Sequence, residues 1–326
     1  MSSYPATLAA RIAPGKIRQV EQAIELSVRG KAQAVRMALV CLLARGHLLI
    51  EDVPGVGKTT LAQALARTVD GAFHRLQFTS DMLPSDVLGV TVYNAHTEEF
   101  EFKPGPVFTN FLLADEINRT TPKTQSALLE AMNEQQVSVE GRTLTLPDPF
   151  MVIATQNPAD HHGTYPLPES QLDRFLMRLR IGYPDVRSER DIIRQPDTMH
   201  GETTPQVLSR EELLDLRCAV KDIQVDDAIV DYMLKLIERT RKHEGLALGV
   251  SPRGSQALYR AVQANALVEG RGYALPDDVK VLAPRVLGHR VMPDARTSLA
   301  RRRESNNAAA GERIIEEILS EIEVPL

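Results

Sequence analysis

The stretch that decides the fold is Asp52-Val-Pro-Gly-Val-Gly-Lys-Thr-Thr60. It follows the short apolar run His47–Glu51 and leads into Thr59–Val69, whose apolar residues recur at helical spacing. A glycine-rich turn between a strand and a helix directs backbone N–H groups and the positive end of the helix dipole at one point. Gly55 and Gly57 allow the backbone to curl closely around an anion. The stretch therefore predicts a phosphate-binding loop.

The side chains of this loop suit a nucleotide triphosphate. Lys58 is expected to reach the β and γ phosphates, and the hydroxyl of Thr59 to bind magnesium. Asp52 stands where the pattern G-x-x-x-x-G-K-[ST] has its first glycine, so the turn must accept a side chain and some unusual dihedral angles. An ordinary glycine-rich turn after a strand is the alternative. The predicted nucleotide-binding residues are Pro54, Gly55, Val56, Gly57, Lys58, Thr59 and Thr60.

A second apolar strand, Phe111–Ala114, ends in two carboxylates, Asp115 and Glu116. Phosphoryl transfer needs metal charge, alignment and a base. We therefore expect Asp115 to hold magnesium, directly or through water, and Glu116 to polarise the attacking water. Apolar strands also end in acidic residues that merely cap the next helix, so this assignment depends on the phosphate loop.

Asn157 follows a further apolar strand, Phe150–Ala154. Ligands of open α/β sheets bind at the carboxyl ends of the strands, where an amide can orient the water that attacks the phosphate. Asn157 also precedes a proline, and by local sequence a turn-forming role is equally consistent.

Two arginines are candidates for contacts with the phosphates. Arg174 follows a short helix and is interpreted either as an arginine finger for a neighbouring subunit's γ-phosphate or as the ion-pair partner of Asp173 or Glu169. Arg253 lies in the first turn of a helix that Ser251-Pro252 begins. From there it reaches the phosphates out of a lid domain or forms a surface ion pair.

The chain has 326 residues, of which 43% are hydrophobic and 25% charged, as in globular proteins. Its 38 basic and 43 acidic residues give a net charge of −5, so no overall basic field attracts nucleic acid or acidic lipid. The strongest apolar run near the N-terminus, Met37–Leu43, is far shorter than the ~20 residues of a membrane span. Without a signal-peptide pattern, we expect a cytoplasmic protein.

The order of elements predicts an α/β domain followed by a small all-helical lid. Further strands at Phe73–Phe78 and Leu176–Ile181 alternate with helices, which is typical of a parallel sheet covered on both faces. Two inserts, Thr91–Phe102 and Val137–Leu146, are interpreted as hairpins. We place the α/β domain at 1–194, a linker at 195–208, the lid at 209–292, and a mobile connector with a last helix at 293–326.

Five segments, taken together, resemble the MoxR family of AAA+ ATPases. They are Val53-Pro-Gly-Val-Gly-Lys-Thr59, Leu113-Ala-Asp-Glu-Ile-Asn-Arg119, Ala154-Thr-Gln-Asn-Pro158, Leu167-Pro-Glu-Ser-Gln-Leu-Asp-Arg-Phe175 and Ser251-Pro-Arg253. The resemblance covers about residues 16 to 292 and leaves the tail from Arg296 outside it.

The resemblance implies a P-loop AAA+ fold that hydrolyses ATP with Mg²⁺ in a hexameric ring, with ATP bound between subunits. It implies that Arg174 is supplied by the neighbour and that Arg253 matches the position called sensor two. It also implies a chaperone-like remodeler of a protein partner, commonly one with a von Willebrand factor A domain, with the two hairpins facing the pore or the partner. The residues that act within one subunit are then Lys58, Thr59, Asp115, Glu116 and Asn157.

A DNA-translocating or helicase-like motor is the alternative function, because related rings with such inserts act on nucleic acid. The net charge and the 5% of aromatic residues weigh against it. A nucleotide-gated scaffold without hydrolysis is disfavoured by Glu116 and Asn157.

Overall fold

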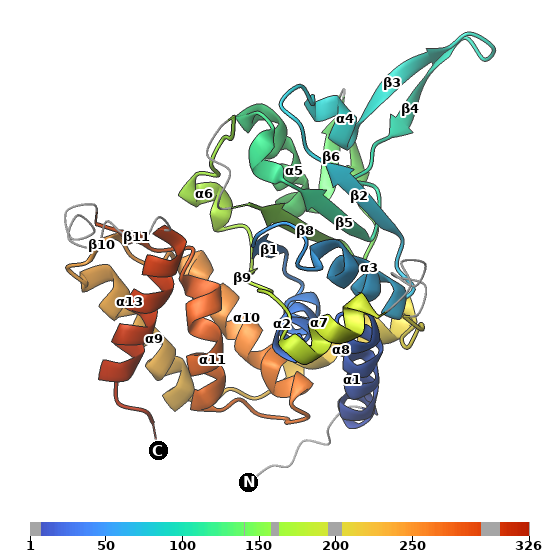
Figure 1. Cartoon of the computed structure of the whole chain (residues 1–326). Helices are drawn as coiled ribbons and strands as arrows, with labels where there is room; N and C mark the ends of the chain where they lie inside the picture. The colour runs from blue at the N-terminus through green and yellow to red at the C-terminus, as the bar shows by residue number, and fades with distance from the viewer. Residues whose placement is uncertain (1–7, 140, 158–162, 195–203, 295–306, 326) are drawn as a thin grey trace.

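The computed structural model describes residues 8–139, 141–157, 163–194, 204–294 and 307–325 (Figure 1). Its centre is a five-stranded parallel sheet in the order β2-β5-β8-β1-β9. This sheet confirms the predicted α/β core. The strands are β1 (Leu48–Glu51), β2 (Phe73–Gln77), β5 (Phe111–Asp115), β8 (Met151–Gln156) and β9 (Met177–Leu179).

Both faces of the sheet are covered, because side chains alternate along its central strands between two apolar clusters. In β5, Phe111 and Leu113 belong to a cluster with the first three helices and the lid, whereas Leu112 and Ala114 belong to a cluster with α4 and α5. The helices of this domain are α1 (Leu8–Ser27), α2 (Ala32–Leu43), α3 (Lys58–Thr68), α4 (Pro84–Leu88), α5 (Pro122–Glu134), α6 (Glu169–Leu172) and α7 (Val186–Ile193), with a 3₁₀ turn, η1 (Ile117–Arg119).

The two inserts are antiparallel hairpins, as predicted. The first pairs β3 (Gly89–Asn94) with β4 (Glu99–Pro104), and the second pairs β6 (Gln136–Val139) with β7 (Arg142–Thr145). Figure 1 shows the first hairpin extending well beyond the sheet. Near its tip Tyr93 and Phe100 are 56% and 69% exposed and stack edge to face. Large apolar side chains are therefore presented far from the core.

The lid is helical, with one departure from the all-helical expectation: β10 (Leu246–Leu248) and β11 (Met292–Pro293) form a small antiparallel ladder. The last helix, α13, packs against α9 and α11. The expected linker and mobile connector fall largely on 195–203 and 295–306, outside the described residues. The lid helices are α8 (Arg210–Ala219), the 3₁₀ turn η3 (Val220–Asp222), α9 (Asp227–Lys242), α10 (Pro252–Val268), α11 (Pro276–Leu287) and α13 (Asn307–Glu321).

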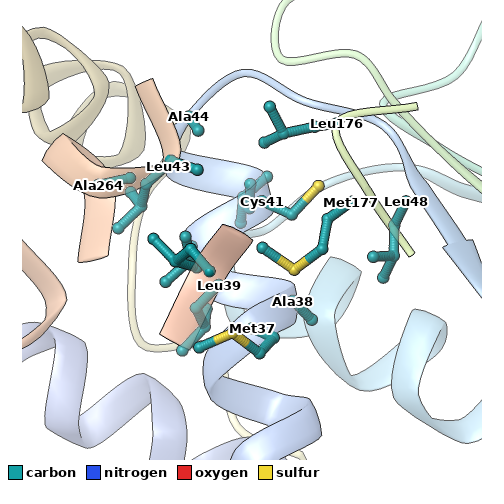
Figure 2. Packing of buried hydrophobic residues seen from close by; sticks show 14 of the residues in the cluster. Met37, Ala38, Leu39, Cys41, Leu43, Ala44, Leu48, Leu176, Met177 and Ala264 are labelled. Atoms are coloured by element: carbon teal, nitrogen blue, oxygen red, sulfur yellow. The ribbon is translucent and has the colours of Figure 1, made fainter. Parts of the chain in front are cut away.

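Helix α2 joins the lid to the sheet. Figure 2 shows its side chains, Met37, Leu39 and Cys41 among them, between Ala264 of α10 on one side and Met177 of β9 on the other. All five are at most 4% exposed. This continuous packing means that the lid and the sheet share one core on this face.

A buried arginine connects the C-terminal helix to the strand before the phosphate loop. Arg178 of β9 has a side chain that is 1% exposed, and its guanidinium lies 3.4 Å from Glu51 and 2.8 Å from Glu312 of α13. Because two carboxylates face one buried cation, its charge is compensated. None of the described helices is both long and apolar enough to cross a membrane.

His47, immediately before β1, is buried and fixed in its neutral form. Its Nδ1 accepts a hydrogen bond from the Val152 N–H at 2.9 Å, and its Nε2 lies 3.0 Å from the Met132 carbonyl oxygen. Burial lowers the pKa of His47 from 6.5 to about 4. Protonation would turn the Nδ1 acceptor into a donor facing another donor.

The free energy of unfolding should therefore fall as the pH drops from about 6.5 to about 4, because the unfolded chain binds a proton that native His47 excludes. The shift corresponds to a loss on the order of 3 kcal/mol. His47→Asn keeps an acceptor for Val152 but does not titrate, so its urea-unfolding free energy should depend less on pH across this window. Parallel pH profiles for the two proteins would contradict the assignment.

Candidate functional site

The phosphate loop joins β1 to α3 and has the backbone that its glycines predict. Gly55 and Gly57 adopt φ values of 85° and 91°, in the left-handed region that side chains disfavour. Gly57 is the N-cap of α3, so the free N–H groups of the first helical turn face the loop. The Lys58 ammonium donates to the Asp52 carbonyl oxygen. Burial lowers the pKa of Lys58, and the nearby carboxylates, including Asp115, oppose this shift.

Asp52 does not strain the loop, so the expectation of unusual dihedral angles is wrong. Its φ is not among the positive values. Instead, its carboxylate accepts hydrogen bonds from the N–H groups of Val53 at 2.9 Å, Ile181 at 2.7 Å and Gly182 at 2.6 Å. The side chain therefore ties the phosphate loop to the segment that follows β9.

Asp115 lies at the end of β5, with both carboxylate oxygens already bonded. Thr155 of β8 donates its hydroxyl to Oδ1 at 2.6 Å. Arg75 of β2 donates to Oδ2 from Nη2 at 2.6 Å and from Nε at 3.1 Å. Charged hydrogen bonds of this kind fix the orientation of a carboxylate. Asp115 is therefore held in place by the two strands that flank β5.

Glu116, one residue further, has an unusual backbone. Its φ of 56° and ψ of 49° place a non-glycine residue in the left-handed region. Its N–H donates to the Thr155 hydroxyl at 2.9 Å, and its Oε2 accepts from Gln77 at 2.6 Å and pairs with Arg119 at 2.9 Å. Such conformations are maintained by surrounding contacts and are typical of functional sites.

Arg75 and Gln77 are site residues that the sequence analysis missed. The strand Phe73–Phe78 was interpreted only as apolar. The period of two puts both polar side chains on one face of the strand. Nothing in the sequence shows that this strand pairs with β5, which brings Gln77 opposite Asp115.

A cavity of about 620 Å³ brings most of the predicted residues together. Asp115, Glu116 and Asn157 line it beside the residues of the loop. Lys31, between α1 and α2, and Ile192 of α7 lie on the same cavity and were not predicted. The predicted residues that line it are Pro54, Gly55, Val56, Gly57, Lys58, Thr59, Thr60, Asp115, Glu116 and Asn157.

The residues in this cavity fit a magnesium ion. The hydroxyl of Thr59 and the carboxylate of Asp115 are hard oxygen donors on one cavity, and Mg²⁺ prefers one or two such protein ligands together with phosphate oxygens. A triphosphate held by the loop would supply the remaining oxygens.

Arg174 and Arg253 lie elsewhere and do not line this cavity. Arg253 donates to Oδ1 of Asn133 near the end of α5. Ser251, two residues before Arg253, donates its hydroxyl at 3.1 Å to Asp173, the residue before Arg174, so the two arginines lie on adjacent segments. Burial, and then the charge of Arg253, lower the pKa of Arg174. Asp173, one suggested partner of Arg174, is instead bonded to Arg290 at 2.7 Å. The two arginines thus lie together outside the cavity.

A parallel sheet with a glycine-rich loop after β1 and carboxylates after β5 defines a P-loop nucleotide-binding fold. Comparison with protein families agrees. The model of the "ATPase family associated with various cellular activities (AAA)" matches residues 47–177, and that of the "AAA lid domain" matches residues 238–317. The second match extends into α13, so the expectation that the family resemblance stops before Arg296 is wrong.

Individual relatives agree over most of the chain. YeaC of Bacillus subtilis is 50% identical over 300 residues, which cover 91% of each chain. Chaperone MoxR1 of Mycobacterium tuberculosis is 47% identical over 275 residues, 81% of this chain and 72% of that one. A crystal structure of a protein from Cytophaga hutchinsonii, assigned as an ATPase, superposes with a TM-score of 0.88 at 36% identity and covers 98% and 97% of the two chains. The chain belongs to the MoxR family of AAA ATPases.

Restoring the usual glycine in the phosphate loop should damage it. Asp52→Gly leaves the N–H groups of Ile181 and Gly182 without their acceptor, so the free energy of unfolding should fall by about 1–3 kcal/mol. ATP should bind about tenfold more weakly if ~1.4 kcal/mol of this anchoring is lost from the bound state. Urea unfolding and calorimetric titration measure both effects. Asp52→Asn keeps one acceptor oxygen, so its stability and its ATP affinity should lie between those of the original protein and those of Asp52→Gly. Unchanged stability with tighter ATP binding would contradict the anchoring role.

Proposed function

We propose that this protein is a magnesium-dependent enzyme that hydrolyses ATP and uses the cycle to remodel a protein client. The observation that carries the proposal is the meeting of Lys58, Thr59, Asp115 and Glu116 on one cavity next to the N-terminus of α3. A point charge, two metal ligands and a base are the parts that phosphoryl transfer requires.

Each of these groups has a distinct task. Lys58 exchanges its bond to the Asp52 carbonyl for one to the β and γ phosphates. Thr59 and Asp115 would hold Mg²⁺, which when bound would supply positive charge to the phosphate oxygens. Glu116 accepts the proton of the attacking water, and Asn157 orients that water. The left-handed backbone of Glu116 and its bonds to Gln77 and Arg119 keep the carboxylate at the edge of the sheet.

The separation of Arg174 and Arg253 from the cavity supports a ring in which each site is completed by a neighbour. Two cations close together repel each other and gain from an incoming polyanion. A neighbouring subunit's γ-phosphate is such a polyanion, and a fixed arginine there stabilises the charge of the transition state. We propose a hexamer, the assembly that the family resemblance implies, with both arginines acting between subunits.

The client is proposed to be a protein with a von Willebrand factor A domain. MoxR1, 47% identical over most of this chain, is named a chaperone. The exposed pair Tyr93 and Phe100 on the hairpin β3–β4 offers apolar surface to such a client. The net charge of −5 supports a protein client over a nucleic acid.

Glu116→Gln should separate ATP binding from ATP hydrolysis. The amide keeps the size of the side chain but cannot accept the proton, so turnover should fall by about 10² to 10⁴-fold. Calorimetry should show an ATP affinity close to that of the original protein. Glu99→Gln, on the exposed hairpin, is the matched control and should turn over normally. Near-normal turnover of Glu116→Gln would remove this residue from the proposed role.

Arg174→Ala should bind ATP but lose about 10³-fold or more in turnover, because its guanidinium acts on a neighbour's phosphate. Lys58→Ala should fail to bind ATP yet still offer an intact Arg174. Mixing the two proteins should therefore restore part of the steady-state turnover. Native mass spectrometry can show that mixed rings form. If turnover is not restored in such rings, the site is not shared between subunits.

A further inference from the structure

Arg174 lies in the turn between α6 and β9, and the backbone of this turn is held by one side chain. Arg290, three residues after α11, donates from Nη2 to the carbonyl oxygens of Asp173 at 3.2 Å and Phe175 at 2.6 Å. Its Nη1 donates to the Leu176 carbonyl at 3.0 Å. The residues on both sides of Arg174 are therefore bonded to the same guanidinium.

The guanidinium of Arg290 is buried and its charge is compensated. Its side chain is 2% exposed, and its Nε donates to Oδ1 of Asp173 at 2.7 Å. Burial lowers the pKa of Arg290 to about 10, with Asp173 opposing the shift, so the group stays charged at neutral pH. Breaking one partner of a buried charged pair is strongly destabilising, which keeps the turn and the lid together.

The same pair also contacts the helix that carries Arg253. The Ser251 hydroxyl donates to Oδ2 of Asp173 at 3.1 Å and, as the N-cap of α10, accepts from the Gly254 N–H at 3.1 Å. The Cδ of Arg290 lies so close to Gly254 that a Cβ there would be 3.0 Å away. Arg253 is itself exposed, but in the chain it lies between Ser251 and Gly254, which both contact the Asp173–Arg290 pair.

We propose that Arg290 is a positioning residue that, through Asp173, holds Arg174 and Arg253 together as one unit facing a neighbouring subunit's triphosphate. This inference rests on the proposed action of Arg174 between subunits. The two like charges would tend to separate if their backbones were free. The Asp173–Arg290 pair opposes this separation before the nucleotide binds. Charges fixed in advance need no reorganisation when the transition state forms.

The test uses Arg290→Lys, which keeps the charge but replaces the planar fork by a single ammonium group. We expect ATP to bind with an affinity within about threefold of the original and turnover to fall by about 10²-fold, as misplaced catalytic groups cause. Mixing with Lys58→Ala should restore turnover, because Lys58→Ala supplies a correctly held Arg174. Mixing with Arg174→Ala should restore none, because neither protein then offers a working finger.

Asp173→Asn is the second variant, for use if Arg290→Lys does not fold. It keeps the carbonyl contacts of Arg290 and removes only the charge of its partner, so a smaller loss of turnover with the same pattern of rescue is expected.

Arg217→Lys is the matched control. Arg217 is another buried arginine, 1% exposed, bonded to the Leu42 carbonyl at 3.0 Å and to Asp148 at 3.3 Å, and neither partner belongs to the turn. Arg217→Lys should lower the melting temperature without reducing turnover at 25 °C.

Two results would overturn the positioning role. One is normal turnover of both Arg290→Lys and Asp173→Asn. The other concerns the mixing experiments. If Lys58→Ala restores the turnover of Arg174→Ala but not that of Arg290→Lys, the loss of turnover in Arg290→Lys comes from general misfolding. If Arg174→Ala itself keeps normal turnover, the proposed finger fails, and the positioning role fails with it.

Discussion

The parallel pairing of β5, β8 and β1 is the constraint on which the site depends. Ala154 pairs with both Ala114 and Leu49, so the carboxyl ends of the three strands reach the same edge of the sheet. The residues that follow each strand therefore meet there. A slip of one residue in β8 would turn Thr155 to the opposite face of the sheet, and Asp115 and Glu116 would lose their shared hydroxyl. The chemistry of the site is in this sense a property of strand register.

The polar groups of the site are bonded to other groups of the protein. Lys58 bonds to the Asp52 carbonyl, Asp115 to Arg75, and Glu116 to Gln77 and Arg119. In the proposed function, a triphosphate would exchange several of these bonds for its own. Because exchanging one hydrogen bond for another changes the free energy little, binding can be reversible and the site stays ordered between cycles.

The sequence predicted those features of the site that depend on neighbours in the chain. A glycine-rich turn after a strand, and carboxylates or an amide after other strands, are local patterns, and the cavity brings Lys58, Asp115 and Asn157 together as expected. The residues that were missed depend on distant contacts. Arg75 reaches Asp115 only through the pairing of β2 with β5, and Arg290 reaches the Arg174 turn from more than 100 residues away. No local pattern marks either of them.

The Asp52 prediction failed for a different reason. The usual loop pattern suggests a requirement on the backbone at its first position, whereas within the loop the left-handed conformations occur only at Gly55 and Gly57. The carboxylate of Asp52 instead bonds to the segment after β9, a contact that no pattern within the loop contains. The roles of Arg174 and Arg253 stay predictions.

The packing of α13 has a consequence for how the chain can be shortened. Ile315 and Ile318 of this helix are at most 1% exposed, and Glu312 bonds to Arg178 beside the strand that leads to the phosphate loop. Figure 1 shows the helix lying along α9 and α11. A polypeptide ending at residue 294 would therefore expose an apolar stripe on the lid, which would promote aggregation. An affinity tag is therefore better attached after α13 than used to replace this helix.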